Sequence, residues 1–338
     1  MADNINTGDY KGIWCVAEVR RGQIHSSLYE LITLGRRLSQ ETSEDLCCVV
    51  VGSGITAAAK ALSVYGAKRV YVVDAAGLAN YTDDAYSRVL VELVKKHKPS
   101  KVFMPGTTVG RSWAARVTVT LGTGLGSDVS AVEFDKASGG LKMTRSCHGG
   151  SMNVEVTCPG SRPEMATLRL GSYEKAKPVN GSAIDCVEEK FDLAAWNLRS
   201  RFVKYDAEVS QMADIGQADV IVSGGFGIGK QENFKLLEDL AKLLGGGVGA
   251  SRRVVDLGWI PYRQQVGLTG RTVKPKLYIA CGISGQVQHL AGMSQSDVIV
   301  CINKDPEAPL MKIANLAVEG DLEEIVPALI AEVKKAKS

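Results

Sequence analysis

Short apolar runs that alternate with helical segments constrain the fold of this chain more than any other feature of its sequence. The apolar runs that suit buried strands span 13–19, 46–51, 69–73 and 101–104. The segments with helical spacing that follow them span 26–38, 55–64, 82–96 and 110–121. This rhythm is typical of a parallel sheet with helices on both faces. We therefore predict an N-terminal, mostly parallel α/β domain.

Two changes of pattern divide the rest of the chain. Between residues 129 and 170 the apolar residues recur with period two, which predicts an antiparallel ribbon. Segment 185–217 is more polar and less periodic, so we predict a linker there. The alternation then resumes, with strands at 219–223, 276–281 and 297–302 and helices at 232–244, 286–291 and 322–335. We therefore predict two domains, 1–206 and 207–338, the second being a doubly wound α/β domain.

Composition and charge exclude several classes of protein. The 40 lysines and arginines nearly balance the 37 acidic residues, which argues against a nucleic-acid or anionic-membrane partner. The apolar runs fall short of the ~20 residues that cross a bilayer. The first residues lack a secretory or transit segment, so we expect a cytoplasmic bacterial protein. The eight cysteines form no C-x-x-C pair and the four histidines are scattered, so we expect reduced, buried thiols and no metal site.

A glycine-rich segment follows the first predicted strand of the C-terminal domain. Residues 224–230 have the spacing G-x-x-x-x-G-K of a phosphate-binding loop, but Gln231 stands where such a loop needs Ser or Thr for magnesium. This departure disfavours ATP hydrolysis. A tight strand-to-helix turn without a ligand is the alternative for this segment.

Two other segments place donors where a ligand can approach the backbone closely. Ser251 and Arg252 follow the small residues 245–250, and a cation in that position suits an anionic or electron-rich ligand. The alternative is a surface loop with a solvated arginine pair. Thr269 lies between Gly267 and Gly270, where its hydroxyl can donate to a planar heterocycle. The alternative for this segment is an ordinary β-turn.

Polar residues also follow the later strands. Ser284 and Gly285 open a short helix whose amides suit a phosphate, and His289 lies about one turn further on. Asn303 follows an apolar strand, at the edge where open α/β sheets bind ligands. Asp321 suits either a ribose hydroxyl or the N-cap of the last helix. A packed helical histidine is the alternative for His289.

Four blocks carry a resemblance to a known family. In order and spacing they resemble the α subunit of the electron transfer flavoproteins, also called the FixB family: 249–252 (GASR), 265–270 (QVGLTG), 282–293 (GISGQVQHLAGM) and 302–309 (INKDPEAP). Segments 110–112, 124–129 and 162–169 match more loosely, so the resemblance covers nearly the whole chain. It implies one subunit of a heterodimer, with an N-terminal domain that packs on the β subunit and a C-terminal domain that binds FAD.

The resemblance also implies partners and site residues. Electrons are expected to pass between acyl-CoA dehydrogenases, or NADH through a second FAD, and a downstream acceptor, with ferredoxin or flavodoxin as possible partners if the complex bifurcates electrons. Ser251 and Arg252 are expected near the isoalloxazine and pyrophosphate. The remaining residues implied around the flavin, its phosphates and the adenosine end are Gln265, Val266, Gly267, Leu268, Thr269, Ser284, Gly285, Gln286, Val287, Gln288, His289, Asn303, Asp321 and Leu322.

Three of these residues are expected to act on the flavin ring itself. Arg252 and His289 are expected to raise the potential at which the flavin takes its first electron, and Thr269 is expected to hydrogen-bond the flavin N5. Two positions depart from the family pattern. Phe226 stands where the family commonly has arginine, and Leu268 replaces a frequent glutamine, so it offers only backbone.

Other functions remain open at this point. A nucleotide hydrolase and a non-redox regulator that binds an adenine nucleotide are alternatives outside the family. Within the family, the chain is compatible with a simple shuttle in fatty acid β-oxidation and with a bifurcating complex.

Overall fold

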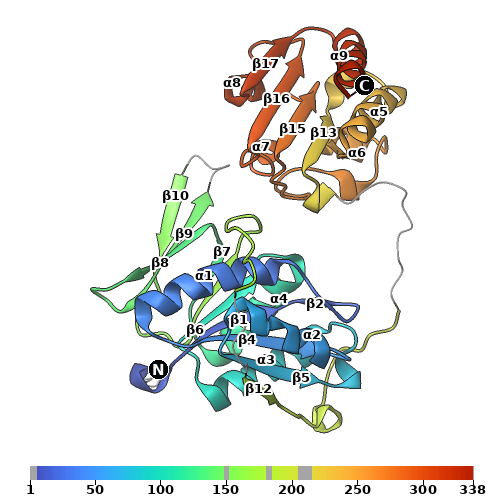
Figure 1. The fold of residues 1–338 in the computed structure, drawn as a ribbon. Coiled ribbons are helices and arrows are strands. Elements are labelled where there is room, and N and C mark those ends of the chain that lie inside the picture. Colours follow the sequence, from blue (N-terminus) through green and yellow to red (C-terminus); the bar gives the residue numbers. More distant parts are fainter. Residues whose placement is uncertain (1–5, 148–151, 180–184, 205–214, 338) are drawn as a thin grey trace. The chain divides into compact units, whose positions relative to one another are not determined.

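The chain forms two compact units. The computed structural model describes residues 6–147, 152–179, 185–204 and 215–337. The N-terminal unit ends at residue 204 of this set and the C-terminal unit begins at residue 215 (Figure 1). The predicted boundary between residues 206 and 207 lies outside the described residues.

A seven-stranded parallel sheet forms the centre of the N-terminal unit. In spatial order its strands are β12 (Asp185–Glu188), β5 (Arg69–Asp74), β4 (Leu46–Gly52), β1 (Ile13–Ala17), β6 (Lys101–Pro105), β11 (Glu164–Leu168) and β7 (Leu125–Val129). Every pairing between neighbours is parallel. The helices are α1 (Ser27–Thr42), α2 (Thr56–Lys60), α3 (Asp83–His97) and α4 (Thr108–Leu121).

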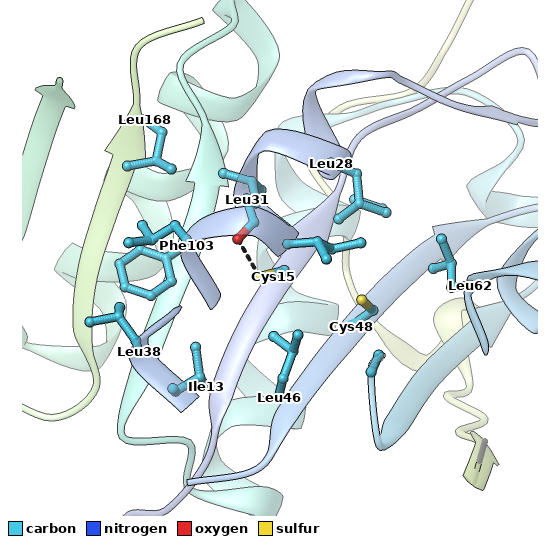
Figure 2. Close-up of a cluster of buried hydrophobic side chains, with 14 of the residues drawn as sticks. Ile13, Cys15, Leu28, Leu31, Leu38, Leu46, Cys48, Leu62, Phe103 and Leu168 are labelled. Carbon is cyan, nitrogen blue, oxygen red and sulfur yellow. Dashed lines mark hydrogen bonds between the residues drawn. The ribbon is translucent and has the colours of Figure 1, made fainter. Parts of the chain in front are cut away.

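The central strands are buried on both faces. In β1, Ile13 and Cys15 pack with Leu31 of α1, whereas Trp14 and Val16 belong to a second cluster that contains α3 and α4 side chains. Figure 2 shows the first cluster, in which the side chains of β1, β4 and α1 meet. Strands buried on both faces read as continuous apolar runs. The prediction of a parallel sheet covered by helices is therefore confirmed.

The cysteines of this sheet behave as small apolar side chains. Cys15 is buried, and its Sγ donates to the Leu31 carbonyl oxygen across 3.2 Å (Figure 2). Burial raises the pKa of the Cys15 thiol well above its ordinary value and raises the pKa of Cys47 to about 11. Thiols held protonated in this way are poor nucleophiles.

The predicted antiparallel ribbon is only partly correct. Strands β8 (Ala131–Asp135), β9 (Gly140–Cys147) and β10 (Met152–Val156) form an antiparallel sheet. Strand β11 instead lies parallel between β6 and β7, so the ribbon prediction is wrong for it. All five residues of β11 are buried, and burial on both faces favours the interior of the parallel sheet over an exposed ribbon. A small hairpin, β2 (Val19–Arg20) with β3 (Gln23–Ile24), follows β1.

The predicted linker is also wrong in its first part. Strand β12 pairs with β5, and Arg69 Nε lies 2.7 Å from Asp185 Oδ2. Beyond it, Phe191, Trp196 and Leu198 pack against the core of the N-terminal unit. These apolar side chains are spaced too irregularly to predict a helix or strand, yet they are partly buried against that core. Residues 205–214 of the predicted linker lie outside the described residues.

The C-terminal unit is built on a five-stranded parallel sheet. In spatial order its strands are β14 (Gly247–Ala250), β13 (Val220–Gly224), β15 (Leu277–Cys281), β16 (Val298–Asn303) and β17 (Leu316–Glu319). The helices are α5 (Phe234–Leu244), α6 (Arg252–Asp256), α7 (Val287–Leu290), α8 (Pro309–Ile313) and α9 (Leu322–Lys337). The chain runs from β13 out to β14 and then returns to β15, so the winding reverses between β13 and β15. This reversal confirms the predicted doubly wound fold.

Strand β14 was not predicted, because segment 245–250 was interpreted as small residues that let a ligand approach the backbone. Its four residues are all buried. Glycine is needed directly before this strand, because a Cβ on Gly246 would lie 2.4 Å from the Val220 carbonyl oxygen. The glycines that suggested a ligand loop therefore let one edge strand approach its neighbour. Strand β17 was also missed, since most of its residues are exposed at the other edge.

Candidate functional site

The residues singled out in the sequence lie at the carboxyl ends of the five C-terminal strands. Ser251 follows β14, Phe226 follows β13, Ser284 follows β15, Lys304 follows β16 and Asp321 follows β17. Because all five strands are parallel, these ends meet at one edge of the sheet. Ligands of doubly wound sheets bind outside this edge, at the point where the winding reverses. The fold thus assembles one candidate site from segments that are far apart in the sequence.

The loop that resembles a phosphate-binding loop is closed by its own hydrogen bonds. Gly225 N donates to Cys281 O across 2.9 Å, and Gly227 N donates to Gly282 O across 3.0 Å. The amides of residues 228–230 also donate to protein carbonyls. A nucleotide hydrolase of this type uses these amides to hold phosphate. The geometry therefore argues against the hydrolase alternative.

The turn after β15 differs from this loop, because its backbone amides are not used within the described part of the protein. Among the residues that the structure describes, the amides of 284–288 donate to no protein acceptor. Leu310 N donates to Ser284 O across 3.1 Å and anchors the turn. Gly285 has φ +86°, and a Cβ there would lie 2.6 Å from Leu310 N. The turn consequently presents a group of backbone donors that suits an anion such as a pyrophosphate.

The loop at 265–270 is fixed between β14 and α7. Val266 N donates to Ala250 O across 2.9 Å, and Leu268 N donates to Gln288 O across 2.7 Å. Gly267 has φ +144° and lies so close that a Cβ would be 2.9 Å from Gln288 O. The Leu268 side chain is 70% exposed. These contacts place Thr269 at the exposed tip of a rigid loop.

Thr269 keeps its hydroxyl hydrogen available. Gln265 Nε2 donates to Thr269 Oγ1 across 2.9 Å, and the Tyr262 hydroxyl donates to the Thr269 carbonyl oxygen. The threonine oxygen already accepts a hydrogen bond, so its own O–H can point outward to an acceptor. Gln265 was expected among the cofactor contacts. The structure buries it and shows it supporting Thr269.

His289 is buried and neutral. Its Nε2 lies 3.0 Å from the Tyr278 hydroxyl oxygen, whereas Nδ1 is buried with no hydrogen-bond partner among the described residues. Burial lowers the pKa of His289 to about 4, and the nearby Val266 backbone acts in the opposite direction. At neutral pH the ring is therefore uncharged. It can supply a hydrogen bond to a ligand but not a positive charge.

The two arginines after β14 have different surroundings. Arg252 is exposed, and its Nε lies 3.3 Å from Asp256 Oδ2. Arg253 lies over the Phe226 ring, with Cζ 3.5 Å from the ring centroid. Trp259 stacks with Phe226 at a centroid distance of 6.0 Å. Sequence reasoning missed Arg253, since an adjacent arginine pair gave no reason to choose between its members. It also missed Tyr278, because a tyrosine within an apolar strand has the pattern of an ordinary core residue.

The residues expected at the adenosine end have protein partners. Asn303 Nδ2 donates to Ile283 O across 3.0 Å. Asp321 Oδ1 accepts from Glu323 N across 2.9 Å, and Lys304, 2.8 Å from Asp321 Oδ2, lowers the pKa of the Asp321 carboxyl. Asp321 therefore caps the last helix, one of the two roles expected for it. Leu322 is buried in the core of this unit, so it can offer a ligand only its backbone.

A doubly wound sheet with free backbone donors and a buried, uncharged imidazole at its carboxyl edge defines a nucleotide-cofactor-binding α/β protein. Residues 13–192 match the model of the electron transfer flavoprotein domain, and residues 214–294 match that of the electron transfer flavoprotein FAD-binding domain. The chain belongs to the family of electron transfer flavoprotein alpha subunits and FixB proteins. FAD is the cofactor that this match assigns to the C-terminal unit.

Full-length relatives agree with this assignment. The chain is 42% identical to Protein FixB of Clostridium saccharobutylicum over 98% of both chains. It is also 42% identical to the electron transfer flavoprotein subunit alpha of Clostridium acetobutylicum, over 99% of this chain and 100% of the relative. A third relative, 36% identical over 99% of both chains, is the acryloyl-CoA reductase electron transfer subunit beta of Anaerotignum propionicum.

The described residues offer neither a membrane-spanning helix nor a metal-binding cluster. None of their helices combines the length and apolar character needed to cross a membrane. They also contain no group of three or more His, Cys, Asp or Glu side chains arranged to hold a metal ion.

Proposed function

We propose that this chain is the α-type subunit of a heterodimeric electron transfer flavoprotein that holds FAD at the carboxyl edge of its C-terminal sheet. The observation that carries the proposal is the turn 284–288, whose free amides lie within the segment that matches an FAD-binding domain. Residues 207–338 then form the FAD-binding domain, and residues 1–206 pack on a β-type subunit. A cytoplasmic, bacterial location is part of the same proposal, and cell fractionation tests it.

Different residues at this edge bind different parts of the cofactor. The amides of 284–288 bind the pyrophosphate, while Asn303 and Asp321 lie toward the adenosine end. Arg252 supplies a positive charge, since an arginine stays protonated at any working pH. Thr269 offers its hydroxyl to the flavin N5, and His289 offers a neutral donor. Bound FAD supplies the transfer of one or two electrons, and the protein supplies orientation and electrostatic field.

The donor of the electrons is proposed to be a dehydrogenase that acts on coenzyme A thioesters. The name of the Anaerotignum relative, an electron transfer subunit of acryloyl-CoA reductase, supports this substrate class. A shuttle takes electrons from an acyl-CoA dehydrogenase in fatty acid β-oxidation to one acceptor. In the bifurcating version, NADH reduces a second FAD, and ferredoxin or flavodoxin takes part of the electrons.

One experiment separates these functions. The chain is co-expressed with its β-type subunit, and the FAD content of each heterodimer is measured together with reduction by NADH and by an acyl-CoA dehydrogenase with its substrate. One FAD and no reduction by NADH indicate a shuttle, whereas two FAD and reduction by NADH indicate bifurcation. A colourless heterodimer that takes up no added FAD would contradict the proposal and favour a non-redox nucleotide binder.

A further inference from the structure

Tyr278 and His289 form a buried polar pair behind the candidate site. Tyr278 belongs to β15 and is fully buried, and its hydroxyl oxygen lies 3.0 Å from Nε2 of His289. The two rings are tilted by 59° with centroids 6.1 Å apart, so they meet through the hydroxyl and not by stacking. An unpaired polar group at this depth is costly, so the hydrogen bond constrains the orientation of the histidine ring.

The surroundings of the pair decide which group holds the proton. Burial raises the pKa of Tyr278 far above its ordinary value, so the phenol remains an O–H. The Ser223 hydroxyl lies near the tyrosine oxygen and opposes the rise of the Tyr278 pKa, as a donor to that oxygen does. His289 Nε2 is thus the acceptor within reach of the tyrosine O–H. A neutral imidazole that accepts at Nε2 must carry its proton on Nδ1.

We infer that Tyr278 is a positioning residue for His289, because its hydroxyl holds the neutral imidazole in the tautomer that carries the proton on Nδ1. His289 then presents a fixed, uncharged donor beside Val266, at the base of the loop that carries Thr269. The Nδ1 atom is buried beside the Val266 backbone, whose hydrogen bond favours a proton on the ring and so opposes the larger effect of burial on the pKa of His289. The contact between His289 and a bound group rests on the proposed FAD function. The tautomer of His289 does not depend on that function.

The test uses the full chain with ¹⁵N-labelled histidine. Imidazole nitrogen shifts show directly which ring nitrogen carries the proton, and His289→Gln assigns the signals. Tyr278→Phe removes only the hydroxyl. Tyr86→Phe is the matched control, since Tyr86 is also buried and its hydroxyl donates to the Leu78 carbonyl oxygen across 2.7 Å in the N-terminal unit. FAD affinity of the same proteins, as heterodimers with the β-type subunit, is measured by fluorescence titration.

We expect the wild-type chain and Tyr86→Phe to hold the proton on Nδ1 between pH 6 and 8, and Tyr278→Phe to shift it wholly or partly to Nε2. FAD affinity of Tyr278→Phe should fall roughly two- to tenfold, the effect of losing one buried hydrogen bond. A wild-type proton on Nε2, or a Tyr278→Phe protein with an unchanged tautomer, would overturn the inference. If the expected tautomers appear but no heterodimer binds FAD, the proposed function fails while the positioning role stands.

Discussion

The side-chain amide of Gln265 donates a hydrogen bond to the hydroxyl oxygen of Thr269, with 2.9 Å between Nε2 and Oγ1. Gln265 is buried, whereas Thr269 is exposed at the tip of the loop. A rigid, buried group therefore orients an exposed one, which is how a protein keeps a functional donor in place. The direction of this hydrogen bond leaves the threonine O–H free for a ligand.

The first prediction concerns this pair. Gln265→Met keeps the length of the side chain but removes the amide, so Thr269 loses its support. Thr269→Val removes the hydroxyl itself. We expect each change to weaken FAD binding by about 0.5–1.5 kcal/mol, the usual value of one hydrogen bond. The double variant should lose less than the sum of the two, because both changes remove the same interaction. Strictly additive losses in FAD titrations would show that Gln265 does not act through Thr269.

The second prediction concerns the turn at 284–288. Gly285→Ala places a Cβ 2.6 Å from Leu310 N in a backbone conformation with φ +86°. Gly229→Ala is the control, because Gly229 has φ +82° but open space around its Cβ position. Both variants carry the strain of a positive φ, roughly 1 kcal/mol, and Gly285→Ala adds the displacement of the amides. FAD affinity should fall at least tenfold more in Gly285→Ala. Equal losses in the two variants would remove the turn as the anion site.

The third prediction concerns Phe226 and Arg253. Arg253 Cζ lies 3.5 Å from the Phe226 ring centroid, so the ring holds the guanidinium by a cation–π contact. Phe226→Leu keeps an apolar side chain but removes the ring, and it should cost about 0.5–1 kcal/mol of stability. A double-mutant cycle with Arg253→Met, measured by denaturant unfolding, gives the coupling energy of the pair. A coupling near zero would mean that the contact does not hold Arg253.

The fourth prediction concerns the pH dependence of stability. The pKa of His289 is about 4 in the folded chain and near 6.5 when unfolded, because burial disfavours the charged ring. Below pH 6.5 the unfolded chain binds a proton that the folded chain rejects, so stability falls as the pH decreases toward 4. Above pH 6.5 both states are neutral and the stabilisation is complete. Its full size is about 3 kcal/mol from the linkage relation.

His289→Gln provides the comparison for this effect, since glutamine does not titrate. Hydrogen exchange of peptides from the C-terminal unit, measured between pH 7.5 and 5 and corrected for intrinsic exchange, should show a steeper loss of stability in the wild type than in the variant. Parallel curves would mean that His289 titrates normally and is not buried as described.

Local patterns were sufficient for much of the architecture. The strands and helices around 46–51, 82–96 and 276–281 were predicted within a few residues, because burial on both faces of a sheet or on one face of a helix leaves a periodic record in the sequence. The blocks around Ser251, Thr269, Ser284 and Asn303 indicated a family through their order and spacing along the chain.

The errors share a cause that is not local. Strand β11 lies within the parallel sheet, β12 extends it, and β14 uses its glycines for close strand approach. The roles of Gln265 and Tyr278 also depend on partners that local periodicity does not reveal. Hydrogen-bond direction, depth of burial and the pKa of His289 arise only when distant segments meet.

The sequence by itself determined that two parallel α/β units form and that the segments after β13, β15 and β16 lie at the carboxyl edge of the second. Alternation and spacing are local properties, so they can be recognised without knowing which residues are in contact. Only the tertiary structure decided which turn keeps amides without protein acceptors, which arginine lies over an aromatic ring, and that the histidine is uncharged. These properties depend on the solvent and neighbours around each atom, and folding alone sets them.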